Sequence, residues 1–241
     1  MGEKKAEVPV GKELVRMTGI MKEFPGVKAL DNVKLDLYAG EVLALLGENG
    51  AGKSTLMKIL SGVYQRDDGE IILFGNKIGE WDANKAKNAG VSIIHQELNM
   101  CTHLSVAENI FLGRELIKNG RLDNERMNQE TKEILHKLNI DIDPREQVSE
   151  LAVSKQQMVE IAKAVSYNAK VIVFDEPTSS LTDRETEILM NVIRNLRDQG
   201  VTVVFISHRL SELFEISDRI TVLRDGECVG TIDTKDCTAP Q

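Results

Sequence analysis

The stretch that most constrains this chain is GENGAGKST, residues 47–55. It fits the pattern G-x-x-x-x-G-K-[ST] and directly follows the apolar run VLALL at 42–46. An apolar run ahead of a glycine-rich loop predicts a buried strand that leads into a loop for phosphate groups. Such a loop needs glycines because its backbone N–H groups must approach the phosphate oxygens closely, and a Cβ would obstruct that approach.

Backbone amides and side chains are expected to play different parts in this loop. Lys53 is expected to supply a positive charge for the β- and γ-phosphates, and the Ser54 hydroxyl is suited to bind Mg²⁺. A helix is expected from Ser54 to about Leu60, with the positive end of its dipole toward the phosphates. The alternative, a glycine-rich turn without function, is disfavoured by the strand before it and the helix after it. The residues expected to contact the ligand are Gly47, Asn49, Gly50, Ala51, Gly52, Lys53, Ser54 and Thr55.

The bulk composition limits the class of protein. A chain of 241 residues suffices for one large domain, or for one domain with an inserted subdomain. The net charge of -8 and the scattered basic residues disfavour a nucleic-acid partner. The three cysteines are far apart and odd in number, so we expect reduced thiols. Apolar runs fall short of the roughly 20 residues that cross a bilayer, and the first residues, MGEKKAEVPVGKE, lack a signal-peptide core, which favours the cytosol.

The order of apolar patterns predicts an α/β fold. Nearly continuous apolar runs at 91–94, 171–174 and 201–206 alternate with helical segments, which is typical of a covered, mainly parallel sheet. Alternating residues near 14–20 and 33–37 predict antiparallel strands at its flank, and a further strand at 70–74 is expected to end in a tight turn at Gly75 and Asn76.

The apolar spacing becomes helical between residues 104 and 165. We therefore expect the chain, 1–241, to form one domain. Its α/β core would comprise 12–97 and 166–235, and a helical subdomain, 98–165, would be inserted between them.

Two adjacent acids, Asp175 and Glu176, follow the buried strand VIVF. In an open α/β sheet, groups at the carboxyl end of a strand face the ligand site. Asp175 is therefore expected to hold Mg²⁺ through water, and Glu176 to orient and polarise the water that attacks the γ-phosphate. Two solvated acids without function are the alternative, which the phosphate loop disfavours.

Five motifs in a fixed order, GENGAGKST, IIHQE, LAVSKQQMVEIAKAV, VIVFDEPTSSLT and ISH, resemble the ATP-binding domain of ATP-binding cassette (ABC) transporters. The resemblance covers residues 14–231 and implies a phosphate-loop NTPase (RecA-like) core that hydrolyses ATP with Mg²⁺. The segments FPGVKALDNV, HQELN, LSVAENIFLG and QQMVEIAKA make the chain most similar to the first of two tandem ATPase domains in bacterial monosaccharide importers of the ribose and galactose type.

The resemblance implies roles for three further residues. Phe24 matches the aromatic residue that stacks on adenine, for which a packing role is the alternative. Gln96 matches the glutamine that touches Mg²⁺, senses the γ-phosphate and links the core to the helical subdomain. His208 matches the histidine that contacts the γ-phosphate, although a histidine at a strand end is often only a satisfied polar group. The catalytic set is then Lys53, Gln96, Glu176 and His208, and the metal set Ser54, Gln96 and Asp175.

The chain departs from the family pattern at two places. The usual signature LSGGQ is replaced by Leu151 to Lys155, LAVSK, in which Ala152 lacks the hydroxyl group. The loop after the acidic pair ends in Thr182 where Asp is usual. In a sandwich of two such domains, we expect the site with Lys53 and Glu176 to hydrolyse ATP against the partner's signature, and the site completed by LAVSK to be weak.

The resemblance also implies partners and a location. These are a second ABC ATPase domain, in tandem or in trans, membrane permease subunits and, indirectly, an external sugar-binding protein, with the chain at the cytoplasmic face of the membrane. A soluble ABC-type mechanoenzyme remains an alternative, but it would be expected to carry long basic or coiled-coil insertions. A phosphate-loop kinase or a regulatory module is another alternative, and a kinase would need a second substrate pocket.

Overall fold

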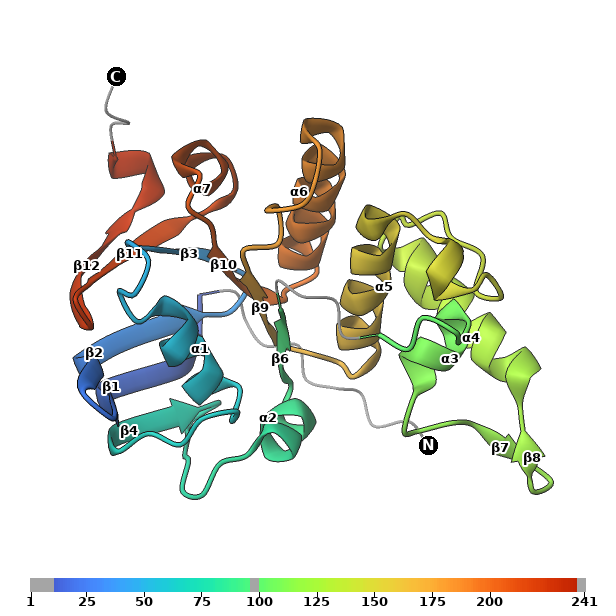
Figure 1. Cartoon of the computed structure of the whole chain (residues 1–241), viewed down its shortest axis with the longest axis horizontal. Helices are drawn as coiled ribbons and strands as arrows, with labels where there is room; N and C mark the ends of the chain where they lie inside the picture. Colours follow the sequence, from blue (N-terminus) through green and yellow to red (C-terminus); the bar gives the residue numbers. More distant parts are fainter. Residues whose placement is uncertain (1–10, 96–99, 238–241) are drawn as a thin grey trace.

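The structure is a computed structural model that describes residues 11–95 and 100–237. Its larger sheet has six strands and lies beside a smaller antiparallel sheet (Figure 1). In spatial order the larger sheet consists of β12 (Glu227–Asp233), β11 (Arg219–Arg224), β3 (Val42–Leu46), β10 (Thr202–Ile206), β9 (Val171–Asp175) and β6 (Val91–Ile94). All neighbouring pairs are parallel except β11 and β12. The prediction of an α/β fold with a mainly parallel sheet is confirmed.

The smaller sheet forms the antiparallel flank that the alternating N-terminal residues predicted. Its strands are, in spatial order, β2 (Val27–Tyr38), β1 (Glu13–Phe24), β4 (Asp68–Leu73) and β5 (Asn76–Lys77). The tight turn after β4 lies one residue earlier than expected. Phe74 and Gly75 take the positive φ values of 51° and 83°, and Asn76 already pairs with Leu73.

Helix α1 (Lys53–Leu60) lies between the two sheets. One hydrophobic cluster joins its apolar side chains to residues of β1 and β2 on one side and of β3 on the other. The two short helices α2 (Ala83–Ala89) and α7 (Leu210–Ile216) and the long helix α6 (Asp183–Asp198) surround the larger sheet. Burial of α1 against both sheets fixes the position of the loop that precedes it.

The segment with helical spacing forms a separate group of elements at the β6 side of the molecule (Figure 1). It contains α3 (Val106–Phe111), β7 (Ile117–Lys118), β8 (Arg121–Leu122), α4 (Asn124–Lys137), a short 3₁₀ helix (Val148–Glu150) and α5 (Val153–Ser166). The β7–β8 hairpin was not predicted. One hydrophobic cluster runs without a break from these helices to the larger sheet, so the division at 98 and 165 stays a prediction.

The parallel register brings the ends of three strands to one edge. Ile206 of β10 pairs with both Leu45 of β3 and Asp175 of β9. The loops that begin at Gly47, Glu176 and Ser207 therefore emerge side by side. Among the helices within 11–95 and 100–237, none has the length and apolar character required to cross a membrane.

Candidate functional site

The loop between β3 and α1 is closed around the side chain of Lys53. The Lys53 Nζ atom donates hydrogen bonds to the carbonyl oxygens of Gly47 at 2.7 Å and Glu48 at 3.0 Å. Lys53 is only 7% exposed, so its ammonium group is held at the mouth of the loop rather than in bulk water. The Ala51 N–H group closes the turn by donating to the Glu48 carbonyl oxygen at 3.1 Å.

The backbone of the loop requires glycine at two positions for different reasons. A Cβ at Gly47 would lie 2.4 Å from the Leu223 carbonyl oxygen on the neighbouring strand. Gly52, the residue before α1, has φ +98°, and a Cβ there would also lie 2.6 Å from the Ala29 carbonyl oxygen. Both contacts are with backbone, which cannot move aside cheaply.

An open cavity of about 300 Å³ lies over this loop, and most of the residues predicted to contact the ligand line it. Of the residues predicted in the loop, all from Asn49 to Thr55 line the cavity, and Glu176 lines it from the opposite side. Gly47 does not line the cavity, but its carbonyl oxygen accepts a hydrogen bond from Lys53, which does. The lining residues are Val27, Ala29, Asn49, Gly50, Ala51, Gly52, Lys53, Ser54, Thr55 and Glu176.

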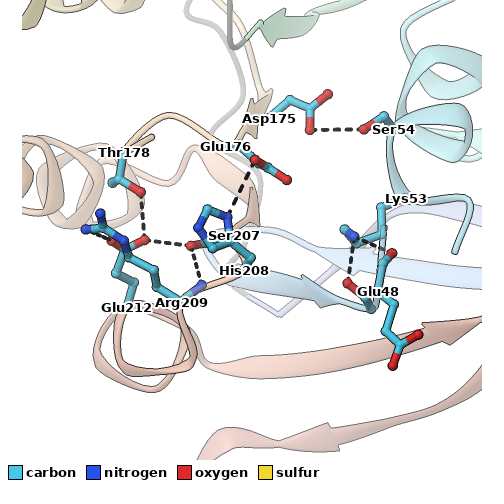
Figure 2. A network of polar contacts seen from close by, with 11 residues as sticks. Glu48, Lys53, Ser54, Asp175, Glu176, Thr178, Ser207, His208, Arg209 and Glu212 are labelled. Carbon is cyan, nitrogen blue, oxygen red and sulfur yellow. Dashed lines mark hydrogen bonds and ion pairs between the residues drawn. The ribbon is translucent and has the colours of Figure 1, made fainter. Parts of the chain in front are cut away.

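Two predicted metal ligands meet beside the cavity. The Ser54 Oγ atom donates a hydrogen bond to Asp175 Oδ1 at 3.2 Å, across 121 residues of sequence (Figure 2). Burial raises the pKa of Asp175 above its usual value; the Ser54 hydrogen bond opposes this shift, and the Glu176 charge adds to it. A partly buried carboxylate whose charge lacks a full counter-charge, next to a hydroxyl oxygen, is a donor set that fits Mg²⁺.

The second acid faces the predicted histidine. His208 Nδ1 lies 3.6 Å from Glu176 Oε2 (Figure 2). The Glu176 side chain is 24% exposed and lines the cavity, whereas the His208 side chain is 59% exposed and does not itself line it. Glu176 has φ +51°, a conformation that residues other than glycine adopt rarely and mainly at functional sites. Its N–H group donates to the Ile206 carbonyl oxygen at 3.0 Å, which ties it to β10.

Two other predicted ligand residues are not placed in the cavity. Phe24 does not line it, and its ring packs edge-on against Tyr64 with the ring centroids 5.5 Å apart. An adenine-stacking role for Phe24 therefore stays a prediction. Gln96 lies outside the described residues, so its predicted contact with Mg²⁺ is untested.

A buried polar network next to the acid and the histidine was not predicted from the sequence. Glu212 on α7 accepts hydrogen bonds from the hydroxyl groups of Thr178 and Ser207 (Figure 2). Ser207 directly precedes His208, and Thr178 follows Glu176 by two residues. In a single sequence Glu212 looks like an ordinary helix-surface acid; the only signal is its place beside Leu213, on the face of α7 that is buried.

The degenerate signature lies on the surface at the start of α5. Ala152 is the residue before the helix, and its side chain makes no capping hydrogen bond. Ala152, Val153 and Lys155 are exposed, and Val153 is 48% exposed. The backbone around them is nevertheless fixed, because Gln156 Nε2 donates to the carbonyl oxygens of Val148 and Leu151.

A glycine loop closed on a lysine, a serine–aspartate pair and a glutamate that faces a histidine, all at the carboxyl edge of a parallel sheet, define a phosphate-loop NTPase fold. A family profile described as ABC transporter matches residues 30–179. The chain therefore belongs to the ABC transporter family.

Similar sequences include proteins named for sugar import. The ribose import ATP-binding protein RbsA of Clostridium perfringens is 51% identical over 225 residues, which cover 92% of this chain and 45% of that protein. The galactose/methyl galactoside import ATP-binding protein MglA of Salmonella typhimurium is 50% identical over 223 residues, covering 92% of this chain and 44% of that protein. The chain thus spans less than half of the length of these relatives.

A solved structure supports the fold independently. An ATP-binding cassette of an ABC transporter in its ADP conformation matches with a TM-score of 0.79 at 26% sequence identity. The match covers 92% of this chain and 91% of that one.

Proposed function

We propose that this chain is an ATP-binding and ATP-hydrolysing domain of an ABC importer that powers uptake of a monosaccharide through separate membrane subunits. The observation that carries the proposal is that Lys53 and Glu176 line one cavity, with His208 3.6 Å from Glu176, in a chain 51% identical to a ribose import ATP-binding protein. The names of these relatives do not favour the alternative of a soluble mechanoenzyme.

The residues divide the chemistry of hydrolysis between them. The amides of the loop and the Lys53 ammonium group bind the phosphates, and they stabilise charge that grows on them during reaction. Glu176 orients and polarises the attacking water, since its carboxylate lines the cavity opposite the loop. His208 contacts the γ-phosphate, and its Nδ1 atom faces the Glu176 carboxylate. Ser54 and Asp175 would hold Mg²⁺, which neutralises phosphate charge when bound.

A second ATPase domain would complete the site. The exposed residues Ala152, Val153 and Lys155 lie beside the loop that ends at Thr182, because Ser154 forms a hydrogen bond with Glu185, and the two segments give a surface suited to such a partner. Because Ala152 supplies no hydroxyl and Val153 adds a bulky side chain, the site that this surface completes is the weaker one. The site with Lys53 would be completed by the partner's own signature.

A membrane subunit would dock in a groove between the core and the helical elements. The groove has a volume of about 270 Å³, and its walls come from the segment after α1, from α2 and β6, and from α5. Docking there places the chain at the cytoplasmic face of the membrane, with a sugar-binding protein reached only through the permease. The groove is lined by Ser61, Val63, Ala83, Lys87, Val91, Ser92, Ile93, Ile94, His95, Glu160, Lys163, Ala164 and Tyr167.

Reconstitution in vesicles tests this proposal. The full-length protein and its membrane subunits are inserted into vesicles with the sugar-binding protein, and uptake of labelled ribose and galactose is measured with and without ATP. We expect ATP-dependent uptake of one of these sugars, and its loss in Lys53→Ala. ATP hydrolysis that neither sugar stimulates, with no sugar uptake, would contradict the import function while leaving the ATPase activity intact.

A further inference from the structure

Glu212 is a buried acid outside the loop cavity that binds three neighbouring groups. The residue is 6% exposed. Its Oε2 atom accepts hydrogen bonds from Thr178 Oγ1 at 2.8 Å and from Ser207 Oγ at 2.7 Å (Figure 2). Its Oε1 atom accepts from Arg209 Nη1 at 3.3 Å. A single carboxylate oxygen therefore joins the loop after β9 to the loop after β10.

The Ser207 bond fixes the backbone on both sides of His208. Ser207 Oγ donates a hydrogen bond to Glu212 Oε2 and accepts one from the Arg209 N–H group at 3.0 Å. The hydroxyl group thus closes a small turn in which His208 is the middle residue. With its proton directed to Glu212, the hydroxyl oxygen keeps its lone pairs free for that N–H group.

The Thr178 bond holds the other loop, which carries the second acid. Glu176 has φ +51°, a conformation that persists only where the surroundings enforce it. On one side Gln157 Nε2 donates to the Pro177 carbonyl oxygen at 2.6 Å. On the other side Thr178 is tied to Glu212. Glu176 is therefore followed by two residues that are both anchored by buried polar side chains.

We propose that Glu212 is a positioning residue, which holds Glu176 and His208 at their working separation by clamping Thr178 and Ser207 onto one oxygen. The proposal rests on the function proposed above, in which Glu176 and His208 serve hydrolysis. Glu212 does not line the loop cavity, so it acts through the two loops and not on the nucleotide.

A carboxylate suits this position better than an amide. All three neighbours donate hydrogen bonds, and an ionised carboxylate only accepts them. In Glu212→Gln, the NH₂ group either faces Arg209 as a contact between two donors or faces the two hydroxyl groups, which must then accept instead of donate. The substitution keeps the shape of the side chain and disturbs the clamp selectively.

Three variants in the full-length protein with its partners test the role. Glu212→Gln, Thr178→Val and Ser207→Ala each remove part of the clamp, and Glu215→Gln removes the same charge from the exposed side of α7 as a control. We expect ATP turnover in Glu212→Gln to fall by up to about 10²-fold, because small misplacements of reacting groups have effects of that size. The two hydroxyl variants should lose less, Glu215→Gln should match wild type, and ATP affinity should stay unchanged in all four.

Combination with His208→Ala separates positioning from general loss of structure. If Glu212 acts by placing His208 and Glu176, Glu212→Gln should slow the His208→Ala protein much less than it slows wild type. Independent effects that multiply in the double variant would overturn the proposal. Unchanged turnover in Glu212→Gln, Thr178→Val and Ser207→Ala on an active wild type would also overturn it. A wild-type assembly without turnover would instead contradict the proposed ATPase function.

Discussion

At the scale of single residues, close approach of backbone to backbone determines the shape of the phosphate loop. Gly47 follows β3 at the point where the chain passes the end of β11. Only hydrogen fits there, because a Cβ would lie 2.4 Å from the Leu223 carbonyl oxygen and 3.0 Å from the Ala51 Cβ atom. The backbone of the loop can pass this close to β11 only because residue 47 is glycine.

Gly47→Ala should therefore destabilise the fold. An overpacked side chain costs about 1–3 kcal/mol, and each kcal/mol lowers the melting temperature by about 2–4 °C in a chain of this size. Thermal unfolding followed by circular dichroism measures the shift. The control is Gly79→Ala, because a Cβ at Gly79 meets no atom within 4 Å. Equal melting temperatures for the two variants would contradict the steric account.

How far the site could be predicted differs from residue to residue. Lys53, Ser54, Asp175 and Glu176 were predictable because a phosphate loop and an acidic pair at a strand end leave little freedom in placement. Glu212 was not, since its burial results from how α7 packs behind two loops, and no local pattern reports that packing.

At the scale of elements, the start of α6 is linked to the start of α5. Thr182 and Glu185 form a capping box, in which the Thr182 N–H group donates to Glu185 Oε2 at 2.9 Å and the Glu185 N–H group donates to Thr182 Oγ1 at 3.4 Å. The Thr182 hydroxyl group also donates to Glu185 Oε2, at 2.7 Å. A hydrogen bond from the Ser154 side chain is the first cause that lowers the pKa of Glu185 to about 2, and the Thr182 bonds follow it. The degenerate signature is thus attached to the loop that ends at Thr182.

This link predicts a dependence of stability on pH. Because the folded pKa of Glu185 lies below its ordinary value of 4.5, ionised Glu185 stabilises the folded state above about pH 4.5. That contribution should decline as the pH falls from 4.5 toward 2. The difference in denaturant midpoint between wild type and Glu185→Gln should shrink over this range. Glu187→Gln, an exposed acid on the same helix, is the control; a constant difference for Glu185→Gln would contradict the link.

The sequence-based predictions of secondary structure failed for short strands and for one turn, where the pattern of apolar residues is weak. Long apolar runs identified β3, β6, β9 and β10, since burial on both faces leaves a continuous apolar pattern. The two-residue strands β7 and β8 carry no such pattern, because their paired residues Ile117 and Leu122 are exposed. The turn after β4 was misplaced by one residue because Phe74 takes a positive φ that glycine or asparagine usually takes.

At the scale of the whole molecule, the two sets of groups that hydrolysis would need lie on separate surfaces. The cavity over residues 49–55 is lined by Lys53 and Glu176, whereas the signature 151–155 leads into α5, which lies at the β6 side of the larger sheet (Figure 1). On the proposed function, we expect this chain to bind nucleotide by itself and to need a second domain for fast turnover. A two-domain sandwich as the working unit stays a prediction.

ATP turnover and ATP affinity of Glu176→Gln in the full assembly show directly whether this site hydrolyses ATP. We expect turnover to fall by about 10²- to 10⁴-fold, as is typical when a group that activates water is removed. ATP affinity should persist, because the loop and Lys53 are unchanged. Turnover at the wild-type rate in Glu176→Gln would contradict the assignment of this site as the hydrolytic one.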